Sequence, residues 1–386
     1  MFSRRNAAAL GAAGLILLLL SWGCSGLRSG EQVLQDPSEL SQGTILEAQG
    51  SRVDREQVLR LLEQSDYIIL GEGHTNPCDH RVQAEILQLL AGSESDFALG
   101  LEMVPSDKQD VLQEFNQGRL GLEELEESLQ WQKIWGHDYS WYQPVLQTAR
   151  QAGIPVYGLN VPQKALQELK DKGLQEMSRQ QRQDLPQPII HPAEDQEQSL
   201  RQEYQRHENF LQGKSHALQD EERFILVQSV WDSQMAQEAI KVHKTGLKVL
   251  ILAGSRHARK DRGIAHRIRI LDNEPRILSL IPWRGSGGIQ SQQGDLFFYC
   301  PQMYASRLGF VLRLKKQEIQ VQEVRPDSRA ARAGFEPGDV LLKAGEREVQ
   351  EIMDLHHAAM QGMKQEGALV FKVRRQGQEL QLELDF

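Results

Sequence analysis

Cysteine is scarce in this sequence, with three among 386 residues, and aromatic residues make up only 6%. So few cysteines exclude a small disulfide-rich scaffold, and a chain of this length can bury a full hydrophobic core without one. The net charge is −9 and no Lys- or Arg-rich run is present, which argues against nucleic acid as a partner. The apolar stretch from Ala7 to Leu20 is too short to span a bilayer.

The amino terminus is predicted to be a targeting segment. Arg4 and Arg5 precede the apolar stretch, and Gly23-Cys24 follows it, which resembles the lipobox of bacterial lipoproteins although Ser21 stands where Leu is usual. The resemblance implies a signal peptide at 1–24, acylation of Cys24, and a lipid-anchored protein of the bacterial envelope, on the outer membrane facing the periplasm. A polar tether is expected at 25–45, since the segment lacks apolar periodicity.

The two remaining cysteines, Cys78 and Cys300, leave alternatives open. They can pair in an oxidising periplasm, and Cys78 follows a candidate site closely enough for metal ligation to be considered. The favoured interpretation is two unpaired thiols, because a domain of this size does not need a disulfide.

Polar residues follow three apolar strands. Glu72 and His74 stand in a Gly turn after the run 67–70, Glu102 follows 97–101, and His257 stands in a second Gly-x-x-His turn after 249–252. Continuous apolar runs are typical of buried parallel strands, and open α/β sheets bind ligands at the carboxyl ends of their strands. We therefore expect these four side chains to meet in one crevice.

Helical patterns alternate with these strands, which predicts an α/β fold with a mostly parallel sheet, helices on both faces and an inserted helical cap. The insertions, at 106–142 and 161–243, are expected to cover the carboxyl edge of the sheet. The first is rich in aromatic residues, among them Tyr139, which either pack the cap or contact an apolar ligand.

Two imidazoles and two carboxylates can hold a divalent metal such as Zn or Mn, with positions open to water or substrate. Arg256 can pair with an anionic ligand group, and Asp79 or Asp232 can orient an imidazole. Each of these three is equally well a solvated or helix-capping charge.

Four motifs follow one another along the chain: Gly71-Glu72-Gly73-His74-Thr75-Asn76-Pro77, Gly100-Leu101-Glu102-Met103, Trp231-Asp232-Ser233-Gln234-Met235-Ala236 and Ala253-Gly254-Ser255-Arg256-His257. Their order resembles that of the ChaN-type haem-binding lipoproteins, which belong with the Tiki proteases and erythromycin esterases to one broader group. The resemblance covers about 46–300. It implies haem binding and iron uptake, with His74, His257, Arg256, Asp232 and Tyr139 as candidate haem contacts. The Tiki relatives imply metal-dependent peptide hydrolysis, with Glu72, His74, Glu102 and His257 as metal ligands and catalytic residues.

The carboxyl-terminal part, 303–386, resembles a bacterial PDZ domain, a small β-sandwich or barrel. It has a Leu-Gly-Phe loop, a Ser-x-Ala-x-x-Ala-Gly helix and a Pro-Gly-Asp turn in the right order. The loop would offer N–H groups to a peptide carboxylate, and the next strand would add the peptide as a further strand. Alternatively, the module only docks onto its own chain. The expected peptide-binding residues are Leu308, Gly309, Phe310, Val311, Leu355 and His356.

The favoured function is a haem- or iron-binding lipoprotein whose PDZ module recruits a protein partner. The alternative is a metal-dependent hydrolase, peptidase or esterase, guided by the PDZ module, with Glu72 or Glu102 as base on metal-bound water. Haem iron usually takes His, Tyr, Met or Cys, so the glutamates have no obvious task in a haem site. A scaffold without chemistry is disfavoured by the four ionisable residues, and a homodimer with haem between two subunits stays open.

Overall fold

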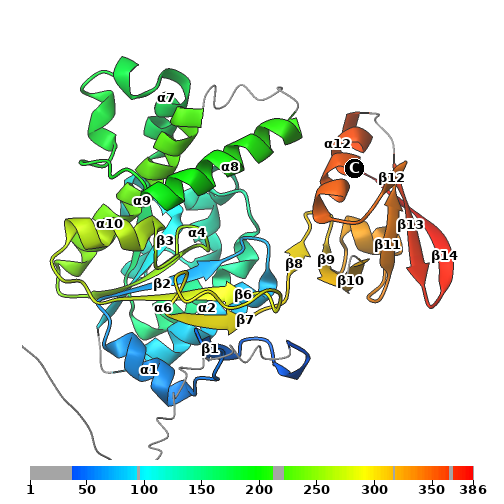
Figure 1. Ribbon diagram of the computed structural model, residues 1–386, viewed down its shortest axis with the longest axis horizontal. Coiled ribbons are helices and arrows are strands. Elements are labelled where there is room, and N and C mark those ends of the chain that lie inside the picture. Colours follow the sequence, from blue (N-terminus) through cyan, green and yellow to red (C-terminus); the bar gives the residue numbers. More distant parts are fainter. Residues whose placement is uncertain (1–36, 94–95, 212–220, 316–317, 365–367, 386) are drawn as a thin grey trace, which may run out of the picture.

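The computed structural model describes residues 37–93, 96–211, 221–315, 318–364 and 368–385. The predicted signal peptide, Cys24 and most of the predicted tether lie outside these residues. Figure 1 shows two bodies, a larger α/β domain and a smaller domain formed by the carboxyl-terminal part of the chain. In the described part of the chain, no helix combines the length and apolar character needed to cross a membrane.

The larger domain is built on a seven-stranded sheet in the order β1-β7-β6-β2-β5-β3-β4. All neighbours pair in parallel except β1, which runs antiparallel to β7 at the edge. The α/β prediction with a mostly parallel sheet is thus confirmed. The strands are β1 (Ile45–Glu47), β2 (Tyr67–Glu72), β3 (Phe97–Pro105), β4 (Val156–Asn160), β5 (Lys248–Gly254), β6 (Ile277–Trp283) and β7 (Leu296–Tyr299).

Helices cover both faces of this sheet (Figure 1). Alternate residues of each strand point to opposite faces, so Ile68 and Leu70 join one hydrophobic cluster and Tyr67 and Ile69 join the other. Helices α1, α2, α3, α4 and α6 supply the first cluster, and α9 and α10 supply the second. The helices are α1 (Arg55–Glu63), α2 (Pro77–Ala91), α3 (Gln109–Asn116), α4 (Leu122–Leu129), α5 (Trp131–Ile134), α6 (Gln143–Ala152), α7 (Gln163–Lys172), α8 (Glu194–Leu211), α9 (Glu221–His243) and α10 (Gly263–Leu271).

The smaller domain has an antiparallel sheet in the order β14-β13-β11-β10-β9-β8, with β12 paired to β11. Its core is a separate cluster that includes Phe310, Phe335 and Phe371. Its elements are β8 (Met303–Ala305), β9 (Phe310–Lys315), β10 (Glu318–Val324), α11 (Arg329–Arg332), β11 (Val340–Ala344), β12 (Arg347–Glu348), α12 (Ile352–Lys364), β13 (Leu369–Arg375) and β14 (Gln378–Leu384).

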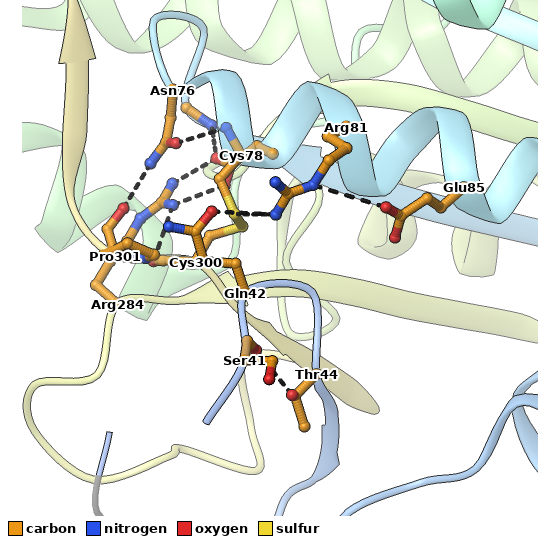
Figure 2. Close-up of a disulfide and its surroundings, with 12 residues drawn as sticks. Ser41, Gln42, Thr44, Asn76, Cys78, Arg81, Glu85, Arg284, Cys300 and Pro301 are labelled. Atoms are coloured by element: carbon orange, nitrogen blue, oxygen red, sulfur yellow. Dashed lines mark hydrogen bonds and ion pairs between the residues drawn. A yellow bond between two sulfur atoms is a disulfide. The ribbon is translucent and has the colours of Figure 1, made fainter. Parts of the chain in front are cut away.

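Cys78 and Cys300 form a disulfide across 222 positions of sequence, with a Cα–Cα distance of 5.8 Å (Figure 2). The preference for two unpaired thiols was therefore wrong. The sequence could not reveal the pairing, because it depends on the first turn of α2 lying beside the chain that leaves β7. The bond fixes the start of α2 to the segment that leads into β8.

We expect the double substitution Cys78→Ser with Cys300→Ser to lower the free energy of unfolding by about 2–5 kcal/mol, because a cross-link over a long loop constrains the unfolded chain. Denaturant unfolding of the larger domain measures this loss. A reductant should lower the stability of the native protein and leave the double variant unchanged. Equal stability of the two proteins would contradict a structural role for the bond.

Candidate functional site

The carboxyl ends of β2, β5 and β3 carry the candidate site. Glu72 pairs in register with Gly254 on β5, and Leu101 pairs with Leu252, so Glu72, Glu102 and the Gly-x-x-His turn of β5 emerge at one edge. Ser255 donates from its backbone N–H and its hydroxyl to the Glu72 carbonyl, at 2.8 and 2.9 Å. The ends of β2 and β5 are thus fastened to each other.

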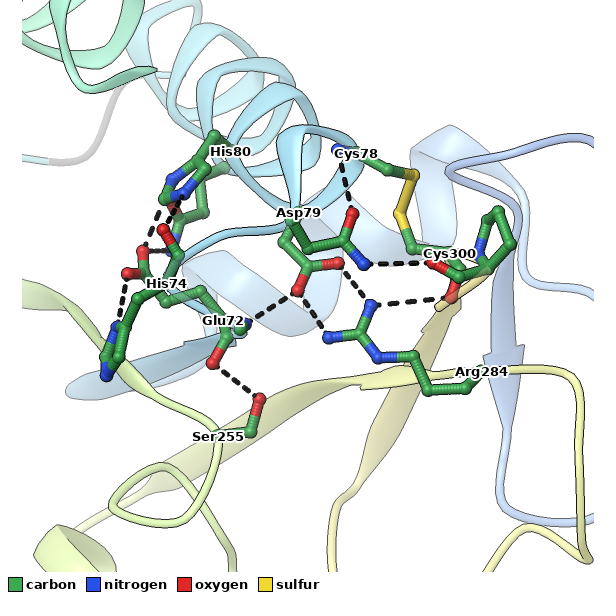
Figure 3. Close-up of polar contacts among 12 residues, drawn as sticks. Glu72, His74, Cys78, Asp79, His80, Ser255, Arg284 and Cys300 are labelled. Carbon is green, nitrogen blue, oxygen red and sulfur yellow. Dashed lines mark hydrogen bonds and ion pairs between the residues drawn. A yellow bond between two sulfur atoms is a disulfide. The ribbon is translucent and has the colours of Figure 1, made fainter. Parts of the chain in front are cut away.

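Glu72 is the buried centre of one half of the site, with 2% of the residue exposed. Its Oε1 lies 2.8 Å from Nδ1 of His74 and accepts a 2.7 Å hydrogen bond from Tyr142. Its Oε2 accepts from Gln83 at 2.8 Å and lies 3.4 Å from Nδ1 of His80. Figure 3 shows His74 and His80 turned toward this carboxylate.

His74 is fixed through Nδ1 by Glu72, while Cε1 and Nε2 of its ring lie over Gly254. A Cβ at position 254 would come within 2.8 Å of Cε1 and 3.0 Å of Nε2, so the ring needs glycine there. The rings of Trp135 and His74 pack nearly perpendicular to each other with a centroid distance of 4.9 Å, and 33% of the His74 side chain is exposed. The ring is therefore oriented on a side chain that is partly open to solvent.

His257 forms the other half of the site. Its Nδ1 lies 2.6 Å from Asp232 Oδ1, and its Nε2 lies 3.7 Å from Glu102 Oε1. The other oxygen of Glu102 accepts the Gly254 N–H at 2.6 Å. Of the two aspartates considered from the sequence, Asp232 orients an imidazole, whereas Asp79 binds Arg284 and the Gly73 N–H (Figure 3).

Burial and neighbouring charge act in opposite directions on the two imidazoles. Burial lowers the pKa of His74, but the hydrogen bond and charge of Glu72 outweigh it and raise that pKa above its ordinary value. Burial likewise lowers the pKa of His257, and the carboxylates of Glu102 and Asp232 reverse the effect. A third ring, His137, lies 5.3 Å from His74; burial and the His74 charge lower its pKa to about 4, so it is neutral at pH 7.

The structure brings Glu72, His74, Glu102, His257 and Asp232 together. Tyr139 lies elsewhere: it is 2% exposed, packs against Trp131 and donates to the Leu122 carbonyl, so Tyr142 is the tyrosine that reaches Glu72. Arg256 has an exposed side chain that pairs with Glu203 of α8.

His80, Gln83 and His137 were not predicted from the sequence, and Trp135 and Tyr142 were predicted only as aromatic residues of the first insertion that either pack the cap or contact a ligand. Their involvement depends on how α2 and the aromatic insertion pack over the strand ends. One signal was available: His80 and Gln83 are three residues apart on a predicted helix, which places them on one face.

The proximity of the four predicted metal ligands, Glu72, His74, Glu102 and His257, does not by itself make a metal site. In the residues that the structure describes, no group of three or more His, Cys, Asp or Glu side chains is arranged to hold a metal ion. Both carboxylates already accept hydrogen bonds, Glu72 from Gln83 and Tyr142 and Glu102 from the Gly254 backbone.

Four of the six peptide-binding residues expected in the smaller domain line a common cavity. Leu308, Phe310, Leu355 and His356 line one cavity of about 650 Å³. Residues of the larger domain, including Thr75, His137 and Trp141, line the same cavity. The cavity therefore lies between the two domains, on the side where His137 approaches His74.

The charge on Glu72 makes stability depend on pH. Burial alone would raise its pKa, but His80, His74 and the Tyr142 hydroxyl outweigh burial and hold that pKa at about 2, below the ordinary 4.5. A carboxyl whose pKa is lowered by folding stabilises the protein above its unfolded pKa and loses this contribution as the pH falls through the folded pKa. We expect the free energy of unfolding to fall by about 3 kcal/mol between about pH 5 and pH 2 on this account.

Urea unfolding over that pH range, on the native protein and on Glu72→Gln, isolates this contribution. The native protein should show the steeper dependence, because the glutamine does not titrate. Parallel curves for the two proteins would show that Glu72 is not held as a stabilised anion.

Comparison with known proteins identifies both domains. The family described as "Haem-binding uptake, Tiki superfamily, ChaN" matches residues 58–268, and the PDZ domain family matches residues 306–386. No curated protein matches the chain.

Solved structures also resemble the chain. The structure entitled "Cofacial heme binding to ChaN of Campylobacter jejuni" is 21% identical, covers 66% of this chain and 95% of its own, and has a TM-score of 0.53, which shows a shared fold. An HtrA3 PDZ domain bound to a phage-derived ligand is 23% identical over 22% of this chain and 84% of its own, with a TM-score of 0.18. An erythromycin esterase, EreC, is 14% identical over 77% of this chain and 89% of its own, with a TM-score of 0.36. Since the first family match spans more than half of the sequence, the chain belongs to the ChaN haem-binding uptake family of the Tiki superfamily, here joined to a PDZ domain.

Proposed function

We propose that the chain binds haem at the carboxyl edge of its parallel sheet, with His74 as the residue that would hold the iron, and that the PDZ domain binds a protein partner. The observation that carries this proposal is the orientation of His74. Nδ1 faces Glu72, which leaves Nε2 as the nitrogen for a metal on a side chain that is one-third exposed.

The donor set fits a haem iron. An imidazole is a common axial ligand, and ligating histidines usually donate their second ring N–H to a carboxylate. Here Glu72 is the carboxylate that faces the second ring nitrogen, Nδ1 of His74. This gives a role to a glutamate, a residue that is not a usual haem ligand. When bound, haem would supply an iron centre for storage or transfer. The chain contributes the oriented ring, and the Trp135 edge beside it supplies apolar contact.

Tyr142 and Gln83 complete the support of this ring. Each donates to a different oxygen of Glu72, so the carboxylate cannot rotate away from His74 without breaking one of these bonds. Trp135 in turn donates to the Tyr142 hydroxyl at 3.0 Å and packs on His74. The aromatic insertion thus positions the same imidazole from two sides.

Titration of the full chain with hemin tests this proposal. We expect the Soret absorbance to rise with added hemin and to saturate at one iron for each site. Free hemin under the same conditions should not show this saturation. A titration without saturation would overturn haem binding.

A metal-dependent hydrolase is the second candidate. Two imidazoles held through Nδ1 by carboxylates, with Glu102 near Nε2 of His257, favour it, because such rings suit a divalent metal. Metal analysis of protein purified without chelator decides between the two. Stoichiometric zinc or manganese, with chelator-sensitive cleavage of a peptide or ester, would favour the hydrolase over the haem-binding protein. Protein without bound metal that is saturated by hemin supports haem binding.

We further propose that acylated Cys24 anchors the protein in the bacterial envelope. The lipobox-like Gly23-Cys24 after an apolar stretch supports this placement. Palmitate labelling of cells that express the native chain and Cys24→Ser tests it. Equal labelling of the two proteins would contradict the anchor.

A further inference from the structure

Strand β9 of the PDZ domain is paired along both of its edges. On one side β10 pairs with it, from Lys315 to Phe310. On the other side β8 pairs antiparallel, with Tyr304 opposite Leu312 and Ala305 opposite Val311. The Ser306 N–H also donates to the Phe310 carbonyl at 2.9 Å. The part of β9 that follows the Leu-Gly-Phe loop therefore offers no open edge.

This occupied edge is the one expected to receive a peptide. A peptide bound by β-augmentation lies antiparallel to the strand after the loop, with its carboxyl end at the loop. β8 has this direction, because its last residue, Ala305, leads directly into the loop. The Tyr304 side chain packs against the PDZ core and lines the interdomain cavity with Leu308 and Leu355. β8 thus has the place and direction of a bound peptide.

The larger domain holds β8 in this place through three links. The Ala305 N–H donates to the Thr75 carbonyl at 2.8 Å, and the Asn76 side chain donates to the Pro301 carbonyl at 2.9 Å. The disulfide joins Cys300 to Cys78 (Figure 2). All three links reach the segment that follows His74.

The PDZ domain itself is also fixed beside the larger domain. Arg307 donates to the Gly136 carbonyl at 2.6 Å, and Arg325 pairs with Asp138 and lies over the Trp141 ring. These contacts keep the short β8 segment from separating from β9 through movement of the whole domain. In Figure 1, β8 is the strand that connects the two bodies.

We propose that β8 is an autoinhibitory strand, which occupies the peptide-binding edge of β9 and must leave it before a carboxyl-terminal peptide can bind. This inference rests on peptide binding by the PDZ domain, proposed above. A site that is open only in a fraction of molecules has an apparent Kd raised by the inverse of that fraction. Loosening β8 should therefore tighten peptide binding without adding any contact to the peptide.

Tyr304→Pro in the full chain tests this directly, because proline removes a ladder donor from β8. The probe is a pool of fluorescein-labelled decapeptides with random sequence and a free carboxyl terminus of Val, Leu, Phe or Ala, measured by anisotropy. We expect the variant to bind at least about tenfold more tightly than the native chain, since one or more ladder hydrogen bonds no longer oppose binding. The same pool with amidated termini should bind neither protein.

Met303→Pro is the matched control. Ladder donors alternate along an antiparallel strand, so the N–H of Met303, like that of Ala305, points away from β9. Tyr304→Ala is the second variant; it keeps the backbone, empties the side-chain position, and should also bind more tightly than the native chain. Circular dichroism checks that each variant folds.

The outcomes separate the two proposals. Equal, carboxylate-dependent affinity of the native chain and both Tyr304 variants would overturn autoinhibition and leave peptide binding intact. No binding by any of the proteins would overturn both. Tighter binding by the Tyr304 variants, with Met303→Pro unchanged, supports the inference.

Discussion

His74→Ala should abolish most hemin binding, with a loss of affinity of at least about 100-fold, since even residues behind a metal ligand commonly change affinity 10- to 100-fold. The substitution removes an imidazole whose Nδ1 is held by Glu72 and whose side chain is one-third exposed. Hemin titration followed at the Soret band measures the loss.

Two further variants make this result specific. His191→Ala removes an exposed histidine outside the site and should leave the titration unchanged. His137→Ala removes the neutral ring that lies 5.3 Å from His74 and should have the smaller effect. A band lost in His137→Ala and kept in His74→Ala would show that the iron ligand is His137.

Asp232→Asn should lower the free energy of unfolding by about 3–5 kcal/mol, because it leaves a buried charge without its partner. Arg267 is fully buried, and its Nη1 lies 3.3 Å from Asp232 Oδ2. Among the residues that the structure describes, its remaining contacts are neutral, to Gln196 and to the Gly263 carbonyl, and its Nε and Nη2 have no hydrogen-bond partner there. Denaturant unfolding measures the change.

The cause of this loss can be tested by removing the other charge. Asp232→Asn combined with Arg267→Met should recover a large part of the stability, since the buried guanidinium no longer lacks its partner, and the loss that remains belongs to the His257–Asp232 contact. Glu56→Gln, which breaks an exposed ion pair with Arg60, should cost less than about 1 kcal/mol. Similar losses for Glu56→Gln and Asp232→Asn would contradict the assigned role of the buried pair.

The centre of the sheet was predictable because β2, β3 and β5 contain continuous apolar runs, and β2 and β5 lead into glycine turns. The same reasoning located Glu72, Glu102 and the two Gly-x-x-His turns, since the carboxyl ends of parallel strands meet at one edge. Chain direction alone was enough to place these residues, without knowledge of the helices.

The remaining features depend on packing between distant segments. Tyr142 reaches Glu72 and Tyr139 does not, which follows from the way one short insertion turns over the strand ends. The disulfide depends on the first turn of α2 lying beside the end of β7, and the pairing of β8 with β9 depends on the chain turning back along β9; no periodicity in the sequence reports either. Glu72 and Glu102 come from the strand ends themselves, whereas Asp232 comes from α9 and Tyr142 from the aromatic insertion.

A crystal structure of the full chain with hemin would show which side chain holds the iron. We expect the iron to be bonded to Nε2 of His74, with the Nδ1 contact to Glu72 retained. Iron held by another side chain, with His74 still turned onto Gly254 and away from the porphyrin, would contradict it.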